Sequence, residues 1–420
     1  MLESGKTARF KAGSILLAIC LLLAAAVRIG ILVYVYDPPT ADARAYIKIA
    51  TEIAQHGRLI DRFGQVAFYS PGFSLVLAPA FAMFGATPAV AQVVGLILSL
   101  VAVGMTYMLA REAGAPTPTP VIATGLMAVY LPVAIHAQSV MKESLTTVLV
   151  LVIAIVGVRT VRYGLSPGTA ILAGVAYGML MLAGPSAMLI ILVLPAACAM
   201  HGGVRSLRRA SMPLAMAAVA AGAVLAPWLI YTARELGRPV LTTNSAFNLY
   251  IGNNPSATGR FISIAKTPLA PDWAGLMHLS EVARADRLNA ASTAWIRAEP
   301  VRAVELALRK LALFFTPQFP SEKSAKRIGI SALGRWAAPV ETVALEVLAV
   351  VGLTMWRRWP QPMRLLPLAF ALFWIVHAAA YIIVRYRDPV MPFACIAAAL
   401  PLAALGRILS WKSRITASSA

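Results

Sequence analysis

One acidic residue, Asp42, stands just beyond the end of the first long apolar run of the chain, in the sequence DARAY. After it, Ala45, Ile49 and Ile53 recur at helical spacing with Tyr46 beside them, which predicts an amphipathic helix. A carboxylate at the N-terminus of such a helix has a structural explanation, because it caps the helix and interacts favourably with the helix dipole. It also has a chemical one: at a water–lipid boundary it would act as a general base on a substrate presented there. The local sequence leaves both interpretations open.

The composition of the chain is that of a membrane protein. Of its 420 residues, 59% are hydrophobic and only 13% are charged, whereas a soluble protein carries about a quarter charged residues. The apolar residues fall into many stretches separated by short charged loops, which excludes a secreted or cytosolic enzyme. The three cysteines all lie inside apolar runs, so a disulfide framework and a zinc cluster are excluded as well.

The apolar stretches predict an all-α polytopic membrane protein with about ten transmembrane helices and both chain ends on one side. The first stretch follows a basic segment and shows no small-residue cleavage site, so we interpret it as an uncleaved signal anchor. Segment 70–85 is short and flanked by prolines, which favours an interfacial or re-entrant helix. The predicted spans are 14–33, 88–110, 119–136, 143–159, 168–184, 186–200, 212–233, 337–356, 365–384 and 389–408.

The formal net charge of +20 would suit a nucleic-acid-binding protein, but its distribution indicates another cause. The short loops assigned to the inside hold fifteen basic residues against Glu3 and Glu112 alone. This asymmetry follows the positive-inside rule and predicts that both termini lie on the cytoplasmic side of the membrane. No nucleic-acid partner is expected.

Two segments on the outer side are too long to be turns. They divide the chain into a transmembrane module (1–233) that contains the first outer loop (34–87), an extracytoplasmic segment (234–336), and C-terminal transmembrane helices with a short cytoplasmic tail (337–420). Within the extracytoplasmic segment, basic and acidic residues recur at helical spacing opposite a Leu, Ala and Phe face. They predict a helix lying on the membrane surface.

Several motifs of these outer segments resemble the GT-C superfamily of membrane glycosyltransferases. Asp42 in DARAY, followed by SPGFSLVLAPAFAMFG, is similar to the first outer loop of that superfamily. NLYIGNNPSATG resembles the polar motif that opens the large outer loop, and WIRAEPVRAVELALRKLALFF resembles the helix-Pro-helix segment that follows. RYRDPVMPF resembles the entry to the last span. The nearest branch resembles aminoarabinose transferases, protein O-mannosyltransferases and rhizobial lipopolysaccharide-core transferases.

This resemblance implies a bundle of about ten transmembrane helices with interfacial helices, and an inverting transfer of sugar from a polyprenyl-phosphate donor. Asp42 would take the proton of the acceptor hydroxyl. Arg385, Arg387 and Lys310 would bind the donor phosphate. Arginines beside a span are also common interface anchors, and a lysine on a surface helix is commonly solvated.

Further residues enter through the same resemblance. Glu143 is the second acidic candidate, although it also fits the start of a helix. Tyr46 and Tyr69 are expected to contact substrate. Asn253 and Asn254 would bond sugar hydroxyls, but their sequence also suits a turn.

The chain departs from the pattern of the branch at two places. Tyr69 and Ser70 stand before Pro71, where aminoarabinose transferases have a lysine, and Gly184 stands where many relatives have an arginine. One phosphate-binding cation is therefore missing.

No metal-binding or ATP-binding motif is present, so no cofactor is expected and the lipid-linked sugar is the substrate. The expected partners are this donor, membrane lipids, and a glycan, lipid or protein acceptor.

Two alternatives stay open: a transporter or flippase of a lipid-linked sugar, and a non-catalytic membrane subunit of a polysaccharide assembly complex. Transport is disfavoured because the polar residues gather on one face rather than at the membrane midplane.

Overall fold

A computed structural model describes residues 2–35, 39, 41–317, 319, 321, 329–331 and 333–418. Across these residues the protein is helical, and the one pair with β-type bonding is an isolated bridge between Arg260 and Ile382. The prediction of an all-α protein is confirmed.

The first part of the chain forms the larger half of the bundle and carries two helices of the first outer loop. Those two are α2 and α3, and both are too short to cross a bilayer. The elements are α1 (Leu2–Tyr34), α2 (Ala41–His56), α3 (Gly72–Phe84), α4 (Pro88–Glu112), α5 (Thr119–Val129), α6 (Leu131–Gln138), α7 (Glu143–Tyr163), α8 (Pro167–Ala183), η1 (Pro185–Leu192), α9 (Val193–Arg209) and α10 (Ser211–Leu236).

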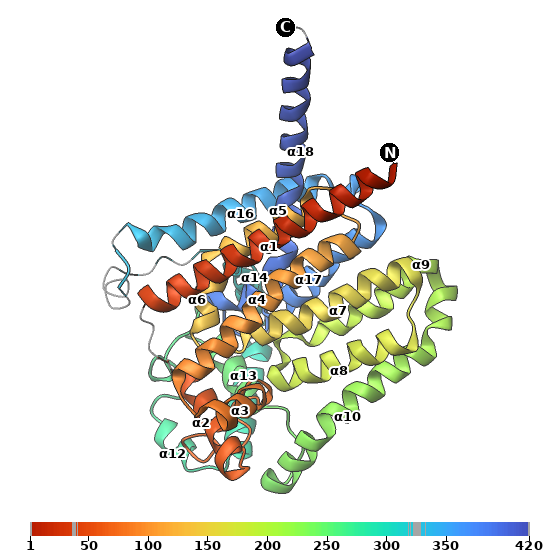
Figure 1. Ribbon diagram of the computed structural model, residues 1–420. Coiled ribbons are helices and arrows are strands. Elements are labelled where there is room, and N and C mark those ends of the chain that lie inside the picture. Colours follow the sequence, from red (N-terminus) through yellow and green to blue (C-terminus); the bar gives the residue numbers. More distant parts are fainter. Residues whose placement is uncertain are drawn as a thin grey trace.

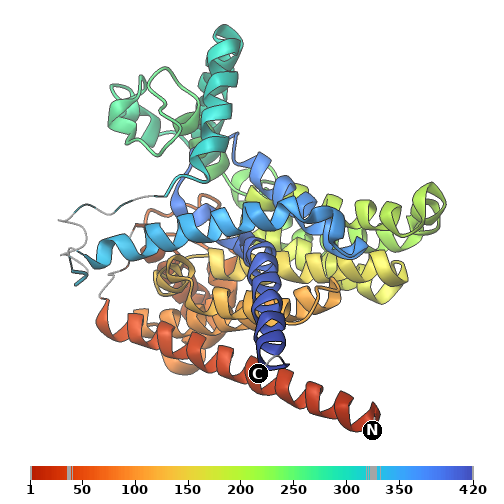
Figure 2. The same cartoon turned by 90° about the horizontal axis from the view of Figure 1, so that it is seen from above.

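Residues 234–336 and the C-terminal helices follow. In Figure 1, α2, α3, α12 and α13 lie together on one side of the bundle, and the end of α18 projects from the opposite side. Figure 2 shows α18 pointing toward the viewer. The elements are α11 (Asn244–Gly252), η2 (Ile264–Lys266), α12 (Trp273–Met277), α13 (Glu281–Ala298), α14 (Pro300–Leu313), η3 (Gly334–Trp336), α16 (Ala337–Thr354), η4 (Trp356–Arg358), η5 (Gln361–Arg364), α17 (Leu365–Val376), η6 (Val384–Val390) and α18 (Met391–Ser418).

By length and composition, the described part of the chain contains 7 helices able to cross a membrane, or up to 8 if the bent pair α5 and α6 forms one span. The chain is thus a multi-pass membrane protein, but the predicted number of ten spans is not confirmed. Two predicted spans coincide with shorter apolar helices, Pro167–Ala183 and Gln361–Val376. The first ends where Gly184 and Pro185 interrupt the helix, since proline offers no N–H and glycine adopts a positive φ there.

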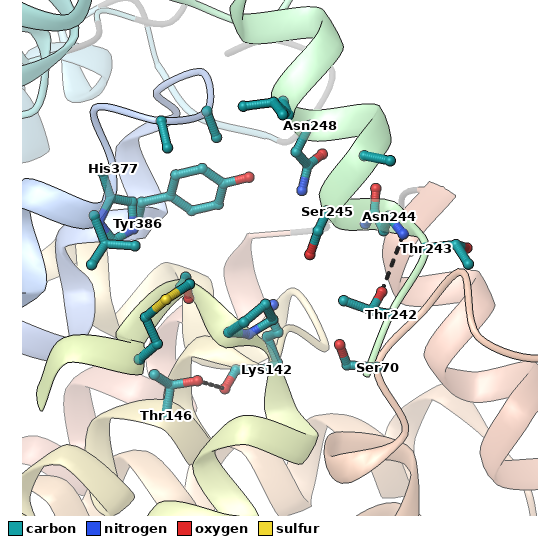
Figure 3. A pocket seen from close by; sticks show the side chains of 18 of the residues that line it. Ser70, Lys142, Thr146, Thr242, Thr243, Asn244, Ser245, Asn248, His377 and Tyr386 are labelled. Atoms are coloured by element: carbon teal, nitrogen blue, oxygen red, sulfur yellow. Dashed lines mark hydrogen bonds between the residues drawn. The ribbon is translucent and has the colours of Figure 1, made fainter. Parts of the chain in front are cut away.

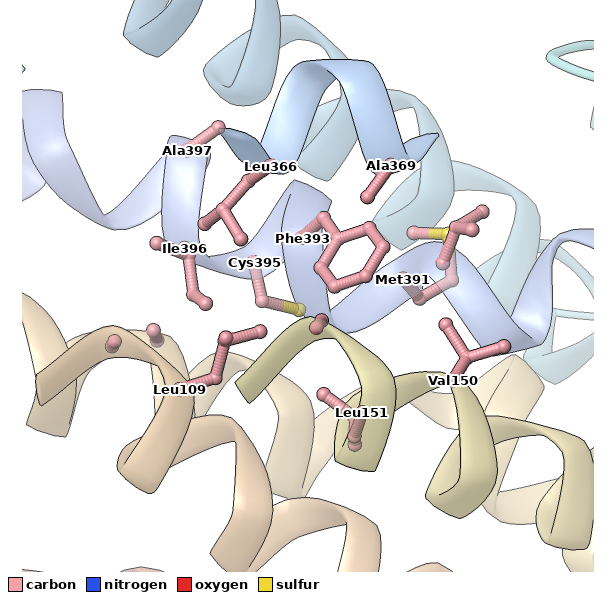
Figure 4. Close-up of a cluster of buried hydrophobic side chains, with 14 of the residues drawn as sticks. Leu109, Val150, Leu151, Leu366, Ala369, Met391, Phe393, Cys395, Ile396 and Ala397 are labelled. Atoms are coloured by element: carbon pink, nitrogen blue, oxygen red, sulfur yellow. The ribbon is translucent and has the colours of Figure 1, made fainter. Parts of the chain in front are cut away.

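The core of the bundle lies where α4, α7 and α18 meet. The apolar windows of α7 and of the span that ends in α18 are each 72% buried, whereas those of α1 and α10 are 17% buried. Figure 4 shows Leu109, Leu151 and Cys395 pointing toward one another in this core. Small residues permit close packing there: a Cβ on Gly352 would overlap the backbone of Ala397.

The charged side chain of Arg28 is fully buried among the helices. The Arg28 guanidinium donates hydrogen bonds to Ser99 Oγ at 2.8 Å and to the Ala128 carbonyl at 2.8 Å. Because an unpaired polar group is costly in an apolar interior, these bonds are what make the buried charge tolerable, and they tie α1 to α4 and α5.

Candidate functional site

The centre of the candidate site is Arg385, which bridges two carboxylates from distant parts of the chain. Its Nη2 donates to Asp42 Oδ2 at 2.6 Å, and its Nε donates to Glu143 Oε1 at 3.0 Å. Asp42 lies in the first turn of α2, Glu143 opens α7, and Arg385 lies in η6 immediately before α18. The packing of these three elements therefore gathers the acidic and basic candidates at one point.

The three side chains differ in their access to solvent. That of Asp42 is 38% exposed, that of Arg385 24%, and that of Glu143 only 7%. Oε2 of Glu143 is buried without a hydrogen-bond partner among the described residues. Asp42 is thus the carboxylate that a substrate can reach, while Glu143 holds the guanidinium from the inner side.

Two tyrosines pack beside Asp42. The Tyr69 hydroxyl donates to Asp42 Oδ1 at 3.4 Å, and the Tyr69 ring meets that of Tyr46 edge-on, with centroids 5.6 Å apart. Burial, followed by the charge of Asp42, raises the pKa of both tyrosines above the usual value. Both hydroxyls therefore keep their protons at neutral pH, and that of Tyr69 donates to Asp42.

A pocket of about 410 Å³ lies directly beside the carboxylates, with Glu143 in its wall. Its other walls come from residues 242–249 around the start of α11, from Ser70, and from Tyr386 next to Arg385. Figure 3 shows Asn244, Ser245 and Asn248 on one side of this pocket and Lys142 on the other. Hydroxyl and amide groups on one wall and a cation on the other suit a polar, anionic ligand.

The turn before α7 sets the direction of Lys142 and Glu143. Val140 in this turn has φ of +54°, a region that β-branched residues rarely adopt. After the turn, Lys142 points into the pocket, and its Nζ contacts the backbone position of Gly184. Lys142 is not among the site residues predicted from the sequence; its contact with Gly184 becomes visible only in the structure.

The pocket wall formed by the start of α11 is attached to residues 66–67 by one partly buried set of hydrogen bonds. The Glu281 carboxylate accepts bonds from Val66 N at 2.8 Å, Ala67 N at 3.0 Å and Thr243 Oγ1 at 2.7 Å. Thr243 N also donates to the Ala67 carbonyl at 2.9 Å. These bonds fix residues 66–70, including Tyr69, against the start of α11. This attachment was not foreseen from the sequence.

The structure does not bring Lys310 and the two asparagines to the carboxylates. Lys310 is fully buried, and its Nζ donates to Asn253 Oδ1 at 2.9 Å and to the Ala378 carbonyl at 3.1 Å. Burial lowers its pKa to about 8. The side-chain amide of Asn254 bonds the Tyr250 and Ile251 carbonyls, and its oxygen accepts from Ser256 N. These groups hold the loop after α11 in place, in agreement with the turn interpretation.

Arg387 is likewise directed away from Asp42. Its Nη1 donates to Glu346 Oε1 at 3.1 Å, and both residues line a separate apolar groove of about 320 Å³ between α16, α17 and α18. Because η6 is a 3₁₀ helix with three residues per turn, residues two apart point to different sides. Of the predicted phosphate-binding residues, Arg385 alone lies at the carboxylates.

Comparisons with known proteins show which solved structures have a similar fold. No protein-family model and no curated protein sequence matches the chain. Among solved structures, an oligosaccharyltransferase from Archaeoglobus fulgidus, in complex with Zn and sulfate, is similar with a TM-score of 0.51 and 18% identity over 94% of this chain. This chain spans about half (50%) of the length of that protein. ArnT from Cupriavidus metallidurans bound to undecaprenyl phosphate gives a TM-score of 0.47 and 14% identity, with 92% of this chain and 76% of that chain covered.

Proposed function

We propose that this chain, whose fold is that of the GT-C membrane glycosyltransferases, moves a sugar from a polyprenyl-phosphate donor to an acceptor hydroxyl on the extracytoplasmic side of a bacterial inner membrane. The fold was implied by the sequence motifs and is confirmed by the structural comparison. The donor, the acceptor and the reaction form the proposal. ArnT is bound to undecaprenyl phosphate, which is a polyprenyl phosphate of the kind proposed here as the lipid part of the donor.

The observation that supports this proposal is the Asp42–Arg385–Glu143 cluster beside a polar pocket. In the proposed reaction the acceptor oxygen attacks the anomeric carbon and forms a new C–O bond. The bond between that carbon and the phosphate oxygen breaks, and the polyprenyl phosphate leaves with the electron pair. The acceptor proton passes to Asp42, the carboxylate open to solvent. A single displacement of this kind inverts the anomeric configuration.

Arg385, Glu143 and Tyr69 would act by positioning. Arg385 compensates the charge of two carboxylates that would otherwise repel each other, and it fixes the direction of Asp42. Tyr69 donates to the remaining oxygen of Asp42. Holding reacting groups in place in this way accounts for a large share of enzymatic rate enhancement.

We propose that the reaction at this cluster needs no resident metal ion. No group of three His, Cys, Asp or Glu ligands occurs in the part of the chain that the structure describes. The two carboxylates nearest the pocket are joined by a guanidinium, a cation that already occupies the space between them. We therefore propose a reaction in which the chain's own residues position the acceptor and the donor.

The proposal is tested by sugar transfer from a lipid-linked donor in membranes that contain the wild type or Asp42→Asn. Removing a general base lowers the rate by roughly 100-fold or more, so Asp42→Asn is expected to lose transfer at unchanged protein level. The matched control is Asp272→Asn, which changes an exposed carboxylate of the other long outer segment, 234–336. Undiminished transfer by Asp42→Asn would exclude Asp42 as the base.

A further inference from the structure

The pocket beside the carboxylates is lined by a lysine, Lys142, whose ammonium forms no hydrogen bond or salt bridge among the described residues, although the charges of Glu143 and Asp42 act on it. Arg238, which also lines the pocket, forms two bonds to Asp286, at 3.0 and 2.6 Å. Arg385 is bonded to two carboxylates. Within the described part of the chain, by contrast, Lys142 Nζ has no hydrogen-bond acceptor, although its side chain lies in the pocket wall. The ammonium is therefore available to a ligand.

The space for this ammonium is provided by the absence of a side chain at position 184. Gly184 has φ of +144°, and a Cβ placed on it would overlap Lys142 Nζ. Pro185 and Ser186 follow in the same wall, and Ser70 lies in the pocket as well. A larger residue at position 184 would move the ammonium away from these groups.

The environment of Lys142 favours an anionic ligand. Burial lowers the pKa of its ammonium, and the neighbouring Arg385 charge acts in the same direction, while the carboxylate of Glu143 opposes both. A partly desolvated ammonium gains more from an anion than a solvated one does, because less water must be displaced. Lysine binds phosphate as a point charge and needs no fixed orientation of the ligand.

We propose that Lys142 binds the phosphate group of the lipid-linked donor in this pocket, at a place where the missing side chain of Gly184 leaves room for the ammonium. This inference rests on the proposed glycosyl transfer. During that reaction the anomeric C–O bond breaks and negative charge builds up on the departing phosphate. Lys142 stabilises this charge without giving up a proton, while the hydroxyl and amide groups of Ser245 and Asn248 on the opposite wall face the sugar.

The test measures ligand binding separately from catalysis. Purified protein in lipid nanodiscs is titrated with undecaprenyl phosphate, with the uncharged alcohol undecaprenol, and with inorganic phosphate. The change in tryptophan fluorescence or thermal midpoint reports binding. Losing one charge-assisted bond is expected to weaken undecaprenyl phosphate binding to Lys142→Met by roughly 10- to 100-fold. Binding of undecaprenol should stay unchanged, and Lys142→Arg should recover part of the affinity.

Two variants control for general effects. Lys266→Met removes an exposed positive charge of the extracytoplasmic segment that does not line the pocket, and it should bind undecaprenyl phosphate as the wild type does. Gly184→Ala should reproduce the loss seen with Lys142→Met. Because the positive φ of Gly184 makes that variant prone to misfolding, the conclusion depends on Lys142→Met.

The outcomes separate this inference from the proposed function. Wild-type affinity of Lys142→Met for undecaprenyl phosphate would overturn the inference even if the protein transfers sugar. Lys142-dependent binding of inorganic phosphate without binding of the lipid would show that the site takes free phosphate, which also overturns it. Lys142-dependent binding of the lipid by a protein that transfers no sugar would support the phosphate site and refute the glycosyltransferase.

Discussion

The Arg385 guanidinium donates to Asp42 Oδ2 at 2.6 Å and so joins two residues that lie 343 positions apart in the sequence. The bond links the first outer loop to the entry of the last membrane helix. The same guanidinium also donates to Glu143. Removing it would therefore change the charge of the cluster, the position of both carboxylates and the stability of the fold.

Replacing Arg385 by Gln leaves two facing carboxylates without a shared cation. We expect sugar transfer to fall roughly 100-fold, because Asp42 loses its fixed direction. Since the Asp42 and Arg385 side chains are partly exposed, water screens part of the lost interaction, and the free energy of unfolding should fall by only about 1–2 kcal/mol. Transfer assays and thermal midpoints in detergent measure the two effects. Arg385→Lys should keep more stability than activity, because an ammonium cannot direct two nitrogens to two carboxylates.

The Glu281 carboxylate is expected to set the shape of the pocket wall. Glu281→Gln replaces one acceptor oxygen by an NH₂ group, which would face the backbone N–H donor of either Val66 or Ala67. We expect the donor KM to rise roughly tenfold with a smaller change in kcat. Hydrogen exchange at residues 63–70 should become faster. Glu305→Gln, an exposed carboxylate on α14, is the matched control. Slow exchange and an unchanged KM in Glu281→Gln would contradict the prediction.

Chelation is expected to leave the reaction intact. Because Arg385 already lies between the two carboxylates, treatment with EDTA should not lower the transfer rate of the purified protein. The rate is compared before treatment, after it, and after addition of Mg²⁺, Mn²⁺ or Zn²⁺. A rate that EDTA abolishes and one of these ions restores would assign a metal to the site.

The buried Lys310 predicts a pH-dependent stability. Its pKa is lowered from 10.5 to about 8 in the folded protein, so between these values the unfolded chain binds more protons than the folded one. The stability contributed by this lowered pKa is present above about pH 10.5 and is lost as the pH falls toward 8. The thermal midpoint of the wild type, measured relative to Lys310→Met, should therefore rise from pH 8 to pH 10.5. A difference that stays constant over this range would contradict the prediction.

The helical membrane fold was predictable from the sequence, but the partners of the basic residues were not. Asp42 and Arg385 were selected separately, and the structure brings them together. Arg387 was selected on the same grounds, yet the 3₁₀ geometry of η6 directs it to Glu346. The bond between Lys310 and Asn253 joins residues 57 positions apart, and no local pattern encodes it. The contact between Lys142 and Gly184 depends on the packing of η1 against the start of α7, which hydropathy does not describe.

Glu143 lines the pocket, and Arg385 links it to Asp42. Asp42 is more exposed than Glu143 and does not line the pocket. In the proposed reaction the donor would thus occupy one side of Glu143 while the acceptor approaches from the other. The donor and the acceptor could therefore be bound at the same time. Steady-state kinetics should then follow a sequential mechanism through a ternary complex, with intersecting rather than parallel double-reciprocal lines.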